Sequence, residues 1–194
     1  MIKKYQSKIQ NGILTITCNP DLKSFDFMKF LVIYQLELTG CTNIIPKLES
    51  QTIKKLEIID CNIKSIKGFQ LENIEVLDIL NNQDKLESNT IVQEILQYKK
   101  LKELSLLKCI IDLRPLCQMN GLNKLSLIYC NLRCIEALRP LVNLAELCLS
   151  FNDNINITSV QYLTNLTILQ LACCDLVNLD VLRPLKKLEK IRYS

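Results

Sequence analysis

The chain has 194 residues, of which 48% are apolar, and 24 basic against 20 acidic residues give it a net charge of +4. This length suits one domain, and no stretch reaches the roughly 18 apolar residues that a membrane span needs. There is no histidine and there are only four glycines, which excludes Ser/His and Cys/His nucleophile pairs and disfavours a glycine-rich phosphate loop.

A short sequence pattern recurs from near the start of the chain to its end. It is clearest in LKELSLLKCII, which begins at Leu101, and in LNKLSLIYCNL, which begins at Leu122. Both segments fit L-x-x-L-x-L-x-x-N/C-x-L. A degenerate copy comes first and an incomplete copy comes last; the copies begin at Asn11, Ile33, Ile53, Ile74, Leu101, Leu122, Leu144, Leu166 and Leu188.

Each copy predicts one short β-strand. Leu104 and Leu106 lie two positions apart, as do Leu125 and Leu127, and in a strand such residues point to the same face. One copy is too short to bury that face alone. Stacking of successive copies therefore predicts a parallel sheet with a continuous core behind it.

The segments that return the chain to the next strand have a different spacing. Leu132, Ile135, Leu138 and Leu141 are three residues apart, which favours a 3₁₀ or extended conformation over a long α-helix. The copy from Ile74 is longer, and its extra segment SNTIVQEILQYKK predicts an α-helix. There we expect a capping box of Thr90 and Gln93 and an apolar stripe of Ile91, Ile95 and Leu96.

The repeats resemble those of the leucine-rich repeat family, and are most similar to the 22-residue class of internalins and protein-phosphatase regulators. The resemblance implies an α/β architecture, a right-handed solenoid or horseshoe with a parallel concave sheet and mostly 3₁₀ or extended convex returns. We expect one domain over residues 1–194. It would hold an N-terminal cap with the degenerate first repeat at 1–32, repeats at 33–187 and an incomplete last repeat at 188–194.

Five of the ten cysteines occupy the N/C position of the repeat: Cys41, Cys61, Cys109, Cys130 and Cys174. The resemblance implies that this residue points inward and satisfies backbone groups of the turn. Cysteines on neighbouring repeats have parallel Cβ vectors, which disfavours a disulfide, so we expect reduced thiols. Reduced thiols and the polar start MIKKYQSKIQ favour a cytoplasmic location, with the nucleus as an alternative. Two glycosylation sequons, at Asn156 and Asn165, point weakly towards secretion.

The resemblance implies a non-catalytic module that binds a partner protein. We expect no enzymatic activity, no cofactor and no metal, because Cys130-x₃-Cys134 lacks the spacing of a zinc site. The modest net charge disfavours a nucleic-acid partner, and no membrane association is expected. The alternatives are a regulatory subunit of a protein phosphatase, a secreted or surface adhesin, and a fragment of a larger protein, because the sequence stops within a strand.

The candidate binding residues lie on the open face of the predicted strands. An apolar stripe there is typical of a partner site, and aromatic residues are typical interface anchors; the other interpretation is that these side chains pack on one another. Acidic residues beside the stripe would steer a basic partner, or would simply keep the face solvated. The predicted set is Glu37, Glu57, Ile59, Asp60, Asp78, Leu80, Leu107, Ile128, Tyr129 and Phe151.

Overall fold

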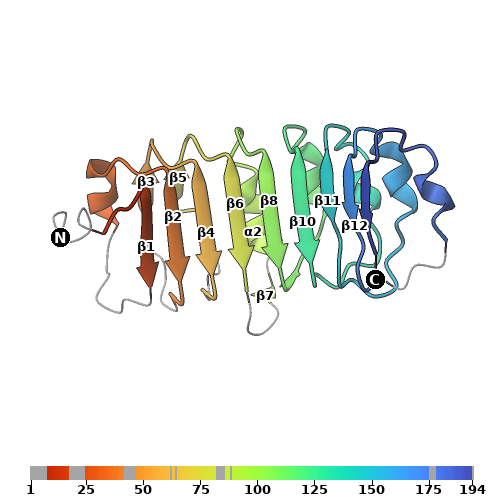
Figure 1. The fold of residues 1–194 in the computed structure, drawn as a ribbon. Coiled ribbons are helices and arrows are strands. Elements are labelled where there is room, and N and C mark those ends of the chain that lie inside the picture. The colour runs from red at the N-terminus through yellow and green to blue at the C-terminus, as the bar shows by residue number, and fades with distance from the viewer. Residues whose placement is uncertain are drawn as a thin grey trace.

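The structure is a computed structural model that describes residues 8–17, 25–41, 47–61, 63, 65–81, 86–87, 89–174 and 178–193. Its main element is a nine-stranded parallel sheet in which the strands follow chain order (Figure 1). The repeat pattern therefore predicted the sheet correctly. The strands are β1 Ile13–Thr17, β2 Gln35–Thr39, β4 Lys55–Ile59, β6 Val76–Leu80, β8 Glu103–Leu107, β10 Lys124–Ile128, β11 Glu146–Cys148, β12 Ile168–Gln170 and β13 Lys190–Arg192.

Equivalent residues of successive repeats are paired across the sheet. Leu104 of β8 pairs with Leu125 of β10, which pairs with Leu147 of β11 and through it with Leu169 of β12. Along each complete strand, buried residues alternate with half-exposed ones, as in β8 and β6. The buried leucines of neighbouring strands thus stack into rows, which is how short strands build one core.

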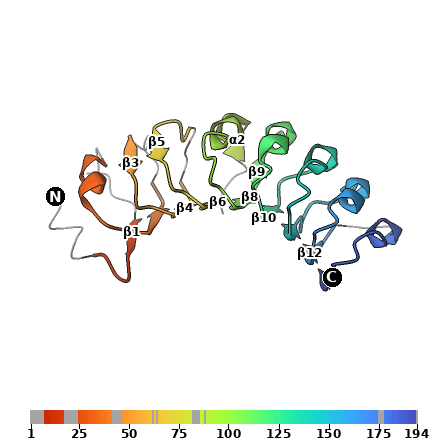
Figure 2. The ribbon, with the colours of Figure 1, turned by 90° about the horizontal axis from the view of Figure 1, so that it is seen from above.

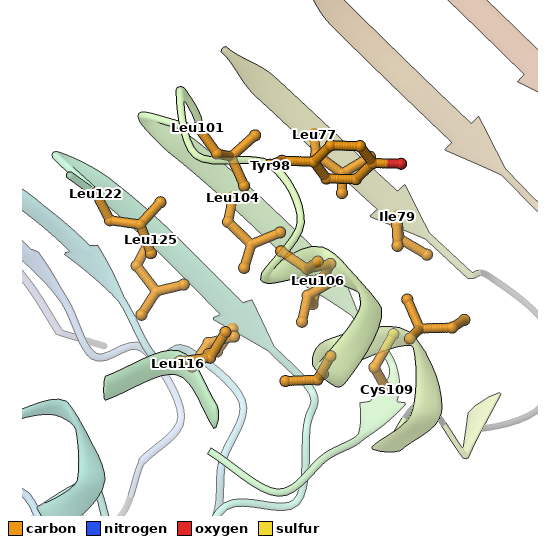
Figure 3. Close-up of a cluster of buried hydrophobic side chains, with 14 of the residues drawn as sticks. Leu77, Ile79, Tyr98, Leu101, Leu104, Leu106, Cys109, Leu116, Leu122 and Leu125 are labelled. Carbon is orange, nitrogen blue, oxygen red and sulfur yellow. The ribbon is translucent and has the colours of Figure 1, made fainter. Parts of the chain in front are cut away.

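The core lies between the sheet and the return segments. Leu77, Leu104 and Leu125 are at most 1% exposed, and Figure 3 shows them projecting from β6, β8 and β10 towards Leu116 and Cys109 on the other side of the core. Each fully buried leucine of this kind contributes about 1.5–3 kcal/mol of transfer free energy. Because every repeat contributes several, burial stabilises the stack along its whole length.

Most returns contain a turn of 3₁₀ helix, as their three-residue spacing predicts. These are η1 Asp26–Phe30, η2 Arg114–Gln118, η3 Glu136–Leu138, η4 Thr158–Tyr162 and η5 Asp180–Leu182. Pro115 stands in the first turn of η2, where its missing N–H costs no hydrogen bond. Figure 2 shows these returns on the outer side of an arc and the sheet on its inner, concave side.

Two short sheets on the return side were not predicted. Strand β3 (Leu48–Ser50) pairs with β5 (Phe69–Leu71), and β7 (Leu86–Glu87) pairs with β9 (Cys109–Ile110). Strands of two or three residues are too short for an alternation of apolar and polar residues to be recognised.

The extra segment of the longest repeat is an α-helix, as expected. Helix α2 (Asn89–Ile95) buries Ile91, Val92 and Ile95, whereas Leu96 is half-buried beyond its end. The predicted capping box is wrong, because the helix begins one residue before Thr90.

Within the part of the chain that the structure describes, none of the helices has the length and apolar character that a membrane crossing requires.

The N/C position of the repeats points inward. Cys61, Cys109, Cys130, Asn152 and Cys174 are buried there, while Cys41 is half-buried. The buried thiols donate to backbone carbonyls, as Cys130 Sγ does to Leu106 O at 3.5 Å. This agrees with the expected role of the position. Asn19 and Asn82, which occupy the same position in two other repeats, lie outside the described residues.

Candidate functional site

The candidate site is the concave face of the sheet, and all ten predicted residues lie there or at its edge. Four apolar residues occupy the same strand position: Ile59 pairs with Leu80, Leu80 with Leu107, and Leu107 with Ile128. All four are half-buried, where we had expected fuller exposure. Since adjacent strands hold them side by side about 4.8 Å apart, they partly cover one another and still form a continuous row.

The row ends at a pair of exposed aromatic rings. Tyr129 and Phe151 follow β10 and β11, and their ring centroids are 5.2 Å apart with planes inclined by 14°. The two side chains are 45% and 41% exposed. Stacked rings that remain open to solvent present a rigid apolar surface to a partner. We call Ile59, Leu80, Leu107, Ile128, Tyr129 and Phe151 together the apolar stripe.

Both aromatic residues have a left-handed backbone, with φ of 60° at Tyr129 and 61° at Phe151. The conformation recurs after other strands, at Gly40, Asp60 and Lys108. This conformation extends the backbone hydrogen bonding between repeats beyond the strands, since Tyr129 N donates to Ser150 O at 3.2 Å and Phe151 N to Ala172 O at 2.7 Å. For a bulky side chain this backbone costs about 1–2 kcal/mol. The sequence offered one signal that we did not use: Gly40 at the same repeat position.

The acidic residues gather on β2, β4 and β6. Glu37 pairs across the sheet with Glu57, and Glu57 with Asp78. Lys55 lies between them, with its Nζ 2.6 Å from Glu57 and 3.4 Å from Asp78. Burial raises the pKa of Asp78 above its usual value and the charge of Glu57 adds to the rise, while Lys55 opposes it. The single ammonium group therefore does not balance the carboxylates around it.

Two positions of the concave face are more buried than their equivalents in other repeats. Cys148 and Ser150 are only 8% and 6% exposed, whereas the equivalent residues of β10, Ser126 and Ile128, are half-buried. The Ser150 hydroxyl accepts the Ala172 N–H at 3.2 Å and lies close to Cys148 Sγ at 3.6 Å. The short side chain of Ser150 thus lies against the next repeat, and the apolar stripe ends at Phe151.

The described residues give no sign of a catalytic centre. No group of three or more Cys, Asp or Glu side chains among them could hold a metal ion. A hollow of about 390 Å³ lies between η2 and η3, lined in part by Arg114 and Arg139. Both guanidinium groups already form ion pairs, Arg114 with Asp112 at 2.6 Å and Arg139 with Glu136 at 2.7 Å. We assign no ligand to this hollow.

No family model matches the sequence, and no curated protein matches it. Solved structures do match. Internalin C2 from Listeria monocytogenes is 20% identical with a TM-score of 0.75, over 100% of this chain and 90% of that one. A leucine-rich repeat protein from Leptospira interrogans is 20% identical with a TM-score of 0.66, over 97% of this chain and 52% of that one.

A third match is the Toll chain of the Toll–Spatzle complex from Drosophila, 14% identical with a TM-score of 0.58, over 93% of this chain and 30% of that one. At these identities the matches establish the fold. The chain is therefore a leucine-rich-repeat solenoid, as its sequence repeats implied.

Proposed function

We propose that the chain is a non-catalytic module that binds a partner protein on its concave face through the apolar stripe. The observation that carries the proposal is the continuity of this stripe: four half-buried aliphatic side chains on adjacent strands lead directly to the exposed Tyr129–Phe151 stack. Contiguous exposed apolar groups of this kind mark interaction sites, and rigid aromatic side chains are frequent binding hot spots. The fold supports it too, since Toll, a structural neighbour, was solved as a complex with Spatzle.

The test replaces the centre of the stripe. Leu107 and Ile128 face away from the core, so Leu107→Ser with Ile128→Ser should leave the protein folded, which urea unfolding checks. The control is Ile110→Ser with Val142→Ser, which removes two aliphatic side chains outside the concave face that are 38% and 47% exposed. A partner captured by the wild-type protein and identified by mass spectrometry is then titrated against all three proteins.

We expect the stripe variant to bind this partner at least tenfold more weakly, a loss of about 1.4 kcal/mol, and the control to bind normally. Normal binding by a folded stripe variant would move the site to the convex face or to an edge. Unfolding of the stripe variant alone would show that Leu107 and Ile128 stabilise the fold instead of forming a binding surface.

A further inference from the structure

The candidate binding region on the concave face has two chemically different ends at a fixed separation. One end, in the N-terminal part of the sheet, carries excess negative charge. The other end, near the middle of the sheet, carries the aromatic pair, and the aliphatic row lies between them. A partner that covers the whole stripe must satisfy both ends. Their chemistry and their distance apart therefore restrict what the partner can be.

The negative end is larger than the predicted acidic residues alone. Glu103 of β8 pairs across the sheet with Val76, two residues before Asp78 on β6, and its charge also raises the pKa of Asp78. The group now holds four carboxylates, those of Glu37, Glu57, Asp78 and Glu103. Among the described residues, Lys55 is the cation with ion pairs to this group, to Glu57 and Asp78; Lys124, which lies opposite Glu103, pairs with Glu146 instead. A partner that supplies a further cation here would relieve repulsion between carboxylates that the folded chain leaves in place.

The separation follows from the strand geometry. From Glu57 and Asp78 on β4 and β6 to the rings after β10 and β11, the sheet advances by three strands, or about 14 Å. The rings also lie three residues further along their strands, about 10 Å in the perpendicular direction. The two ends are thus about 17 Å apart, which an extended chain at roughly 3.3 Å per residue spans in about five residues.

We propose that the partner docks with an extended segment in which a lysine or arginine lies about five residues from an aromatic or large aliphatic residue. The cation binds between Glu57 and Asp78, and the apolar residue packs on Tyr129 and Phe151. Small or aliphatic residues between them cover Leu107. This inference rests on the proposed function and adds the chemistry of the partner segment.

The experiment selects peptides of about 12 residues, long enough to cross the stripe, from a random phage-displayed library on the immobilised full chain. A synthetic copy of the most enriched peptide is then titrated by fluorescence polarisation at low salt. The charge variant is Glu57→Gln with Asp78→Asn. Its matched control is Glu49→Gln with Asp180→Asn, which changes the net charge equally at exposed ion pairs outside the concave face.

We expect enriched peptides to contain Lys or Arg about five residues from a large apolar residue, and the charge variant to bind the peptide at least about tenfold more weakly. The control should change affinity by less than about twofold. Lys55→Met, which removes the internal competitor for the carboxylates, should strengthen binding. Enrichment of neutral or acidic peptides, no enrichment, or equal affinities of charge variant and control would each overturn the inference.

The variant Leu107→Ser with Ile128→Ser distinguishes a failure of the inferred partner chemistry from a failure of the proposed function. If selected peptides lack a cation but their binding is lost in Leu107→Ser with Ile128→Ser, the concave face binds protein and only the partner chemistry is wrong. If the stripe variant binds every selected peptide as the wild type does, the proposed function fails as well.

Discussion

Asn152 joins two repeats through its side chain alone. It is fully buried, and its Oδ1 accepts the N–H of Cys130 at 3.0 Å and of Leu132 at 3.1 Å. Its Nδ2 donates to Leu127 O at 2.8 Å and to Leu149 O at 2.7 Å. One buried amide therefore bonds to backbone groups of both repeats, although Leu149 O also accepts from Cys174 Sγ at 3.2 Å.

We expect Asn152→Ala to lower the free energy of unfolding by more than about 3 kcal/mol, since each buried group left without a partner costs about 1–3 kcal/mol. The control is Asn143→Ala, which removes one exposed hydrogen bond, to Asn120 O at 2.8 Å, and should cost less than about 1 kcal/mol. Urea unfolding of both variants measures the difference. Similar losses would show that the Asn152 hydrogen bonds add little to stability.

We expect Asp78 to lower stability when it is ionised. Its pKa is raised above the ordinary value of 3.8 in the folded state, chiefly by burial. At a pH between the ordinary and the raised pKa, the folded chain therefore holds more protons than the unfolded chain. Stability therefore falls as the pH rises through this window. Asp78→Asn should raise the free energy of unfolding at neutral pH by up to about 1 kcal/mol, and the two proteins should converge below about pH 3.

Urea unfolding across this pH range provides the measurement, with Glu49→Gln as a control that should change stability by less than about 0.5 kcal/mol. A less stable Asp78→Asn protein at neutral pH would mean that the ion pair with Lys55 outweighs the cost of burying the carboxylate.

Within a strand, neighbouring residues lie on opposite faces of the sheet, one in the core and the next on the concave surface. Leu125 of β10 is fully buried, while the next residue, Ser126, is half-exposed on the concave face. Leu125→Ala should lower the free energy of unfolding by about 2–5 kcal/mol, because it opens a cavity beside two neighbouring strands. Ser126→Ala should change it by less than about 0.5 kcal/mol. Equal effects in urea unfolding would contradict the observed alternation.

The strands and 3₁₀ turns could be predicted because each repeats with its own spacing. Leu104 and Leu106 belong to a two-residue alternation, and Leu132, Ile135 and Leu138 to a three-residue one. Strands β3 and β5 have three residues each, and their pairing depends on how neighbouring returns meet. Helix α2 begins at Asn89, before the expected capping box. Glu94 in its last turn accepts the Ile66 N–H at 2.6 Å, a contact with a neighbouring return that a local pattern does not reveal.

The candidate site was predictable in position but not in detail. The repeat pattern assigned Leu80, Leu107 and Ile128 to the concave face, because their strand positions alternate with those of core leucines. The stacking of Tyr129 on Phe151 depends on backbone torsions after the strand, which a hydrophobic pattern does not encode. The burial of Ser150 likewise depends on its hydrogen bond to the following repeat.

For the whole molecule, the cysteines give a test of the cytoplasmic location, which remains a prediction. None of the nine cysteines among the described residues forms a disulfide, and Cys18 lies outside that part. Burial raises the pKa of the Cys174 thiol, which slows its oxidation. We expect ten reactive thiols in protein taken from its native source and denatured without reductant; a count well below ten would favour an extracellular location.

The in-line order of the nine strands has a consequence for how the protein is made. Each strand of this sheet pairs only with the sheet strands of the preceding and the following repeat, so no contact of the sheet waits for a distant segment. Once the first few repeats have stacked, each new repeat that leaves the ribosome finds its preceding neighbour already in place and can add to it. Folding can therefore keep pace with synthesis, and the exposed apolar edge at any moment is that of the newest repeat alone.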